Sequence, residues 1–194
     1  RDLHEDLGST LSSLSILSGQ VKSRLIKQPE TVEPILDKIN ESAIKMNDSL
    51  QDLVWAVKPE NDTLQELLVR MEQFASGILE SKNINYTFTG PTTVSDIKLN
   101  PELIRNIYLI FKEAVNNAAK YSNCANVTIT IKEKGKQLSL SVIDDGIGFN
   151  PETVKRGNGL NNMTKRAAQI GGSLNIISEP NKQSGIVLEC KITS

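Results

Sequence analysis

The chain has 194 residues, of which 38% are hydrophobic and 23% are charged, and its net charge is −1. This length can bury a real core as one domain or two small ones, so a mainly disordered chain is excluded. Balanced charge, few aromatic residues and the lack of a basic stripe argue against a nucleic-acid-binding protein. The single histidine and the distant cysteines Cys124 and Cys190 offer no ligand set for zinc, and they fit a reducing, cytoplasmic compartment.

The start of the sequence indicates a fragment. No apolar run approaches the roughly 18 residues that a membrane span needs, and no secretory signal opens the chain. The first residue already belongs to a helical pattern and is not methionine. We therefore expect a piece cut from a longer protein, and any sensor region, membrane anchor or targeting segment upstream would lie outside this sequence.

The first third of the chain predicts a helical hairpin. Apolar residues recur at steps of three and four in a first helix, at Leu3, Leu7, Leu11, Leu14, Leu17, Val21 and Leu25. A second helix repeats this spacing at Val32, Ile35, Ile39, Ala43, Met46, Leu50, Leu53 and Val57. The short link makes the helices antiparallel, and a second copy of the chain would cover the apolar surface that two narrow seams leave exposed. We expect a homodimer built on a four-helix bundle, whereas a plain dimerisation coiled coil is the alternative for this stretch alone.

The only histidine lies near the start of the first helix. His4 follows the seam residue Leu3 and precedes the acids Glu5 and Asp6. Imidazole is nucleophilic near neutral pH, and a neighbouring carboxylate can orient one ring nitrogen while the other attacks an electrophile. A lone histidine on a polar helix face is usually a solvated surface residue. Whether His4 is a nucleophile or such a surface residue therefore depends on motifs elsewhere in the chain.

The polar segment 58–62 predicts a hinge between a domain over 1–60 and a second domain over 61–194. Within the second domain, the spacing predicts helices over about 63–82, 101–121 and 160–170. Alternating residues predict strands over about 84–89, 126–133, 137–143, 173–178 and 186–192. Antiparallel strands with helices on one side give an α+β two-layer sandwich.

One face of the helix over 101–121 combines a carboxylate, a carboxamide and an ammonium group. Glu113, Asn117 and Lys120 fall at steps of four and three, so they share a face. A carboxamide oxygen can bind Mg²⁺ while a lysine meets phosphate charge. A solvated polar stripe is the alternative for this face by itself.

Two glycine-containing segments follow. In Asp144-x-Gly146-x-Gly148, an acid at a strand end can accept a hydrogen bond from an adenine amine, and the glycines let the backbone approach a ligand. An Asp-Gly turn is also common in hairpins. Gly157-Asn158-Gly159-Leu160 precedes a helix, whose free N–H groups favour phosphate. The spacing matches neither the dinucleotide fingerprint nor the P-loop.

In this order, the three segments resemble the N box, G1 box and G2 box of the histidine-kinase, gyrase, mismatch-repair and heat-shock ATPase superfamily, the Bergerat fold. The resemblance spans about 64–192 and is closest to two-component sensor histidine kinases. Residues 1–8, with His4, are similar to the phosphoacceptor motif of kinases whose response regulators carry helix-turn-helix output domains, the HisKA_3 type. Residues 52–62 are similar to the exit from the second bundle helix of such kinases. The resemblance implies a dimerisation and histidine phosphotransfer domain over 1–60 and a catalytic ATP-binding domain over 61–194.

The resemblance also implies a role for each matching residue. His4 would accept the γ-phosphoryl group of ATP and pass it to an aspartate of a response regulator, and Glu5 would polarise or deprotonate its ring. Asn117 would ligate Mg²⁺, and Glu113 would help to order the metal and its water. The remaining matches would contact or frame the nucleotide: Lys120, Tyr121, Asp144, Gly146, Gly148, Gly157, Gly159 and Leu160.

Four positions depart from the usual pattern of this branch. Glu5 replaces an aspartate, and Ser9 stands where glutamine or histidine is associated with dephosphorylating the partner. Tyr121 replaces a histidine, and Ile186 replaces a threonine near the last strand. None of these changes removes a metal ligand. The alternative function is a dimeric, nucleotide-binding regulatory module that has lost catalysis.

Overall fold

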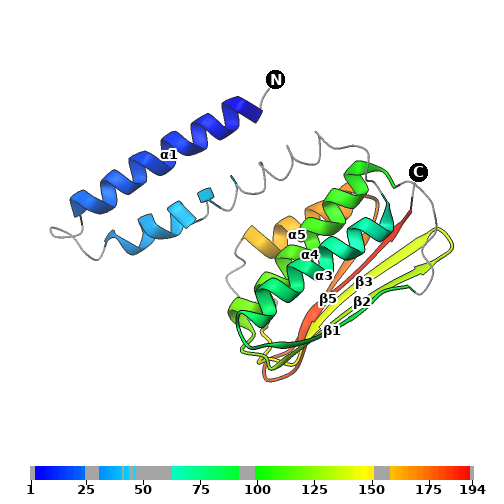
Figure 1. Cartoon of the computed structure of the whole chain (residues 1–194). Coiled ribbons are helices and arrows are strands. Elements are labelled where there is room, and N and C mark those ends of the chain that lie inside the picture. Colours follow the sequence, from blue (N-terminus) through cyan, green and yellow to red (C-terminus); the bar gives the residue numbers. More distant parts are fainter. Residues whose placement is uncertain are drawn as a thin grey trace. The chain divides into compact units, whose positions relative to one another are not determined.

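The computed structural model describes residues 3–24, 31–40, 42–43, 46, 63–91, 99–150 and 158–192, and for residues 3–10 and 158 it describes the backbone alone. The chain divides into two compact units, Arg1–Pro59 and Glu60–Ser194 (Figure 1).

The first unit contains part of the predicted hairpin. Helix α1 (Leu3–Arg24) runs beside a second helical segment that includes residues 33–40 (Figure 1). Leu14, Leu17 and Val21 are half-buried at the predicted spacing, whereas the side chains of Leu11 and Ile16 are 58% and 62% exposed. None of residues 11–24 is buried. The later part of the predicted second helix, over 47–57, and the predicted hinge lie outside the described residues.

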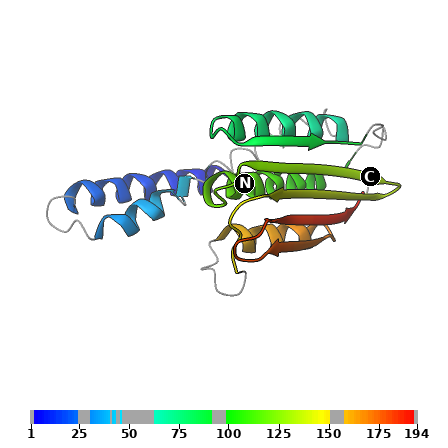
Figure 2. The ribbon, with the colours of Figure 1, turned by 90° about the horizontal axis from the view of Figure 1, so that it is seen from below.

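The second unit is a five-stranded sheet with helices on one face (Figures 1 and 2). The strands are β1 (Asn85–Thr89), β2 (Asn126–Lys134), β3 (Gln137–Asp144), β4 (Ser173–Ser178) and β5 (Ser184–Lys191), in the spatial order β1-β2-β3-β5-β4. The helices are α3 (Leu64–Glu80), α4 (Pro101–Tyr121) and α5 (Asn158–Gln169). β1 pairs with β2 in parallel, and all other pairs are antiparallel. This arrangement confirms the predicted α+β two-layer sandwich, but the prediction that its strands are antiparallel is wrong for β1, which pairs in parallel with β2.

Local capping explains where two of the helices begin. The Thr63 hydroxyl accepts a hydrogen bond from the Glu66 backbone N–H at 3.3 Å, which satisfies a free donor in the first turn of α3. The Asn100 side chain does the same for Glu102 at 2.8 Å, and Pro101 opens α4 without leaving an unsatisfied N–H. Both starts follow the sequence prediction to within one residue.

The core lies between the sheet and the helices. Alternate residues of the central strands are buried, among them Ile129 on β2, Leu140 on β3 and Leu188 on β5. From α4, Ile110 and Phe111 are completely buried. Removing a large apolar side chain from water stabilises a fold by roughly 1.5 to 3 kcal/mol, so these strands and α4 hold each other in place.

None of the helices among the described residues combines the length and the apolar character that crossing a bilayer requires.

Candidate functional site

Asp144 ends β3 with its carboxylate fixed on both sides. One oxygen, Oδ1, accepts a hydrogen bond from the Gly146 backbone N–H at 3.0 Å, and the other, Oδ2, accepts one from the Ser184 hydroxyl at 2.8 Å. The side chain is only 6% exposed, so solvent competes little for these bonds. A carboxylate oxygen has two lone-pair positions, so each oxygen can still accept a hydrogen bond from a ligand amine. The arrangement presents a fixed acceptor of the kind that an exocyclic adenine amine requires.

Ser184 was missed in the sequence analysis. Strand β5 begins at Ser184, two residues before its predicted start, and this residue pairs directly with Asp144 across the β3–β5 ladder. Ile186, which replaces a threonine of the family pattern, pairs with Val142 and is buried. Ser184, two residues before Ile186, therefore places a hydroxyl on the same face of β5. The alternation of β5 could have suggested which face Ser184 occupies, but only the strand pairing identifies Asp144 as the partner of Ser184.

The loop after Asp144 packs too closely against its neighbours to accept side chains at its glycines. A Cβ atom on Gly146 would lie 2.2 Å from the Ser122 carbonyl oxygen, which accepts a hydrogen bond from the Ile147 N–H at 2.8 Å. Gly148 has a φ of +58°, and a Cβ there would lie 2.1 Å from the Glu179 carbonyl oxygen. The loop is thus clamped between the C-terminal end of α4 and the turn between β4 and β5. Both glycines are needed for this close approach.

The predicted face of α4 is near the start of α5. Glu113 and Asn117 are half-buried on α4, and Lys120 is exposed one turn further on. A Cβ built on Gly159 would come within 2.0 Å of the Glu113 carboxylate oxygen Oε1, so the first turn of α5 packs directly against that carboxylate. The structure therefore brings the first and third predicted segments, on α4 and at the start of α5, together at Glu113.

The other predicted site residues are distributed as follows. Leu160 is half-buried in the first turn of α5, and Tyr121 is 72% exposed at the end of α4. The backbone of His4 and Glu5 is helical in α1, while their side chains and the whole of Gly157 lie outside the described residues.

The oxygen donors on α4 suit one kind of metal ion. Within the described parts of the chain, no three histidine, cysteine, aspartate or glutamate side chains gather as metal ligands. Mg²⁺ is usually held by one or two protein oxygens together with the phosphates of its substrate. Asn117 with Glu113 fits that pattern better than it fits a cage made of protein ligands alone.

Asp145, next to the site, stabilises the start of β2. Its carboxylate accepts hydrogen bonds from the Asn126 side-chain amide at 2.7 Å, from the Asn126 backbone N–H at 2.8 Å and from the Ala125 N–H at 2.9 Å. These bonds favour the ionised form and lower the pKa of the Asp145 carboxyl below its ordinary value, the Asn126 side chain contributing most.

Asp145→Ala is expected to destabilise the fold at pH 7, with a loss that shrinks in acid. Because the pKa is lower in the folded chain than in the unfolded chain, the stabilisation is complete above the unfolded value, near 3.8, and disappears as the pH falls through the folded value. Urea unfolding of both proteins from pH 7 down to pH 3 measures this difference. A difference that stays constant over this range would contradict the assignment.

Comparison with known proteins agrees with this geometry. Residues 102–194 match the family described as Histidine kinase-, DNA gyrase B-, and HSP90-like ATPase. The chain is 24% identical over 193 residues to the sensor histidine kinase LiaS of Bacillus subtilis (strain 168), covering 99% of this chain and 52% of LiaS. It is 29% identical over 180 residues to the sensor histidine kinase DesK of the same organism, covering 92% of this chain and 46% of DesK. The chain therefore spans about half the length of these curated relatives.

The solved structure of the Acinetobacter baumannii histidine kinase AdeS has a similar fold, with a TM-score of 0.61 at 15% identity, over 94% of this chain and 96% of that one. At this identity, the likeness supports the fold alone. Residues 102–194 therefore match the histidine kinase-, gyrase- and heat-shock-protein-like ATPase family, and the sensor histidine kinases that are similar over nearly the whole chain support a histidine kinase catalytic core.

Proposed function

We propose that this chain is the ATP-dependent core of a sensor histidine kinase, which phosphorylates itself on His4 and passes the phosphoryl group to an aspartate of a response regulator. The observation that carries the proposal is the Asp144 carboxylate, held by the Gly146 N–H and the Ser184 hydroxyl inside a domain of this ATPase family. The lone histidine, near the start of α1, supplies the acceptor.

The adenine end of the nucleotide would bind at the end of β3. Asp144 would accept a hydrogen bond from the exocyclic amine, and its two protein donors hold the carboxylate in place before the ligand arrives. Gly146 and Gly148 keep the following loop close to α4 and to the β4–β5 turn, so the loop forms a narrow wall beside that carboxylate. Such preorganisation reduces the ordering that binding would otherwise require.

The phosphate end would lie between α4 and the start of α5. Asn117 would hold Mg²⁺ through its carboxamide oxygen, Glu113 would orient a water of that ion, and Lys120 would meet phosphate charge. Bound Mg²⁺ neutralises charge on the phosphate oxygens. Around it, Gly157, Gly159 and Leu160 would offer the backbone N–H groups at the start of α5, and Tyr121 would contact the nucleotide from the end of α4.

At the acceptor, the neutral His4 ring would attack the terminal phosphorus atom. A nitrogen–phosphorus bond forms as the bond from that phosphorus to the ADP oxygen breaks. Glu5 would accept a hydrogen bond from the N–H of the ring, which leaves the other ring nitrogen with its lone pair free for attack. Because phosphoryl transfer depends mainly on positioning and charge neutralisation, the rate would follow how the domain over 61–194 approaches the domain over 1–60.

The first unit would serve as the dimerisation and phosphotransfer domain. On α1, the seam residue Leu11 is more than half exposed, Leu14, Leu17 and Val21 are only half-buried, and none of residues 11–24 is buried. A helix with such an uncovered apolar face gains stability by packing against another copy. We propose that two chains form a four-helix bundle through this face, with a response regulator as the partner in transfer.

Incubation of the chain with γ-labelled ATP and Mg²⁺ tests the function. We expect a protein-bound label that is lost in acid but kept in base, as phosphohistidine requires, and that moves to a receiver domain when a cognate regulator is added. An acid-stable label would contradict the proposed acceptor. Binding of ATP without any labelling would instead favour the catalytically inactive regulatory module.

A further inference from the structure

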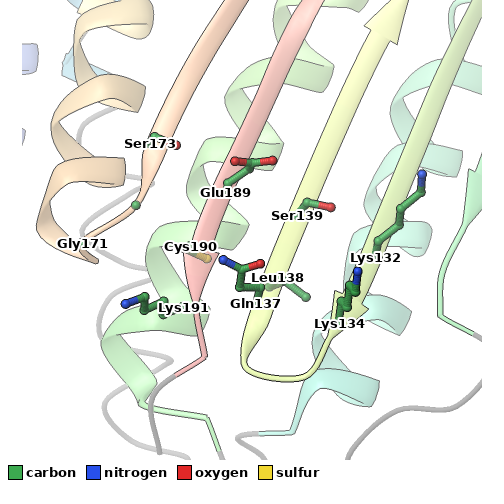
Figure 3. A pocket seen from close by; sticks show the side chains of 11 residues that line it. Lys132, Lys134, Gln137, Leu138, Ser139, Gly171, Ser173, Glu189, Cys190 and Lys191 are labelled. Carbon is green, nitrogen blue, oxygen red and sulfur yellow. The ribbon is translucent and has the colours of Figure 1, made fainter.

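A cavity of about 480 Å³ lies on the face of the sheet opposite the helices (Figure 3). It is formed near the turn between β2 and β3, the end of β5 and the turn between α5 and β4. Its lining includes the polar residues Lys132, Lys134, Lys191, Gln137, Ser139 and Ser173. Helices are visible only behind the sheet in this view, so the cavity opens on the uncovered face (Figure 3).

Strand pairing gathers the three lysines on this face. Lys134 pairs with Gln137, and Gln137 pairs with Lys191, so the three residues form one row across β2, β3 and β5. Lys132 lies two residues from Lys134 and therefore on the same face. Strands are about 4.8 Å apart, so the Cα atoms of Lys134 and Lys191 are roughly 10 Å apart, and their long side chains can reach one ligand.

The lining has a positive net charge. Three lysines and a single acidic residue, Glu189, line the cavity. None of the three ammonium groups forms an ion pair or hydrogen bond with another described residue. Like charges brought close together repel each other, and a bound anion would relieve that repulsion.

We propose that this cavity binds the phosphate group of a small soluble molecule. Its basic residues are all lysines, which bind phosphate as point charges, and three of them suit the multiple negative charge of a phosphate group better than the single charge of a carboxylate. Ser139 and Ser173 add hydroxyl donors, and Gln137 adds an amide donor, for the remaining phosphate oxygens. The volume is within the range of about 300 to 1,000 Å³ that small-molecule sites usually have.

The cavity is separate from the proposed nucleotide site, and the inference does not depend on that function. Asp144 and Gln137 are at opposite ends of β3, about 23 Å apart along the strand. Asp144 is buried with the core residues of β3, whereas Gln137 is on the uncovered face. Backbone amide signals from the two ends of the strand can therefore report the two sites independently.

Titration of the ¹⁵N-labelled chain with inorganic pyrophosphate, without magnesium and at low ionic strength, tests the proposal. We expect amide shifts in residues 134–139 and 189–191. A variant with Lys132→Gln, Lys134→Gln and Lys191→Gln should weaken these shifts by at least about tenfold in affinity, because the attraction of three nearby charges is lost. A matched variant with Lys22→Gln, Lys82→Gln and Lys165→Gln loses the same charge at exposed positions outside the cavity, and should weaken binding less than about twofold.

Unchanged amides, or equal losses in both variants, would overturn the proposal. Binding of an oligoglutamate peptide as tightly as pyrophosphate would overturn the preference for phosphate. Lysine-dependent binding to phosphatidylglycerol vesicles without a response to pyrophosphate would identify a lipid surface as the ligand and would also overturn it. Shifts of the Asp144 and Gly146 amides with an ATP analogue report the proposed nucleotide site, so failure at one site is distinguishable from failure at the other.

Discussion

Replacing His4 with glutamine is expected to reduce labelling by γ-labelled ATP to background while leaving ATP binding unchanged. Glutamine is polar and favours helices, so α1 should keep its structure, but its carboxamide nitrogen has no nucleophilic lone pair comparable to that of imidazole. The measurement pairs the labelling assay with the affinity for a fluorescent ATP analogue. Only the acceptor is removed, so the two readouts should separate.

Ser9→Ala provides the control on the same helix. This substitution also changes a polar residue of α1, but it removes no group that the proposed transfer needs, so labelling should persist. Full labelling of the His4→Gln chain would show that the phosphoryl group is attached elsewhere. Loss of labelling in both variants would point to damage in α1.

Asn117→Ala is expected to slow labelling at least roughly a hundredfold while the dimer stays intact. Mutating a residue that only hydrogen-bonds to a metal ligand already lowers metal affinity or activity about 10- to 100-fold. The carboxamide oxygen of Asn117 is proposed to contact Mg²⁺ directly, so its loss should have at least as large an effect. Because phosphoryl transfer relies on charge neutralisation by the metal, its loss should affect the chemical step strongly. Initial labelling rates and light scattering measure the two expectations separately.

Asn116→Ala is the matched control for this substitution. Asn116 is also a half-buried asparagine of α4, but it is about 100° further back around the helix and so does not share the face of Glu113 and Asn117. Its labelling rate should stay within a few-fold of the parent chain. If both variants lost labelling equally, or if Asn117→Ala became monomeric, the defect would be structural.

Much of the fold was predictable because its elements carry strong local signals. The apolar spacing of α3 and α4 located two helices, since a helix satisfies its backbone within a continuous segment. The alternation of β2 and β3 likewise indicated which side chains would be buried. The chemical types at Asp144 and Gly146 suggested a nucleotide site before any contact between them was known.

Local patterns were enough to indicate the elements, the buried faces and the residue types of the candidate site, because each depends on neighbours within a few positions. The three-dimensional arrangement was needed to establish that β5 lies between β3 and β4, that Ser184 reaches Asp144, and that Gly148 lies against the β4–β5 turn. It also gathered Lys134 and Lys191 on one face of the sheet. Alternation specifies the face of a strand but not its neighbour, since strand order and register are set by pairing between segments far apart in the chain.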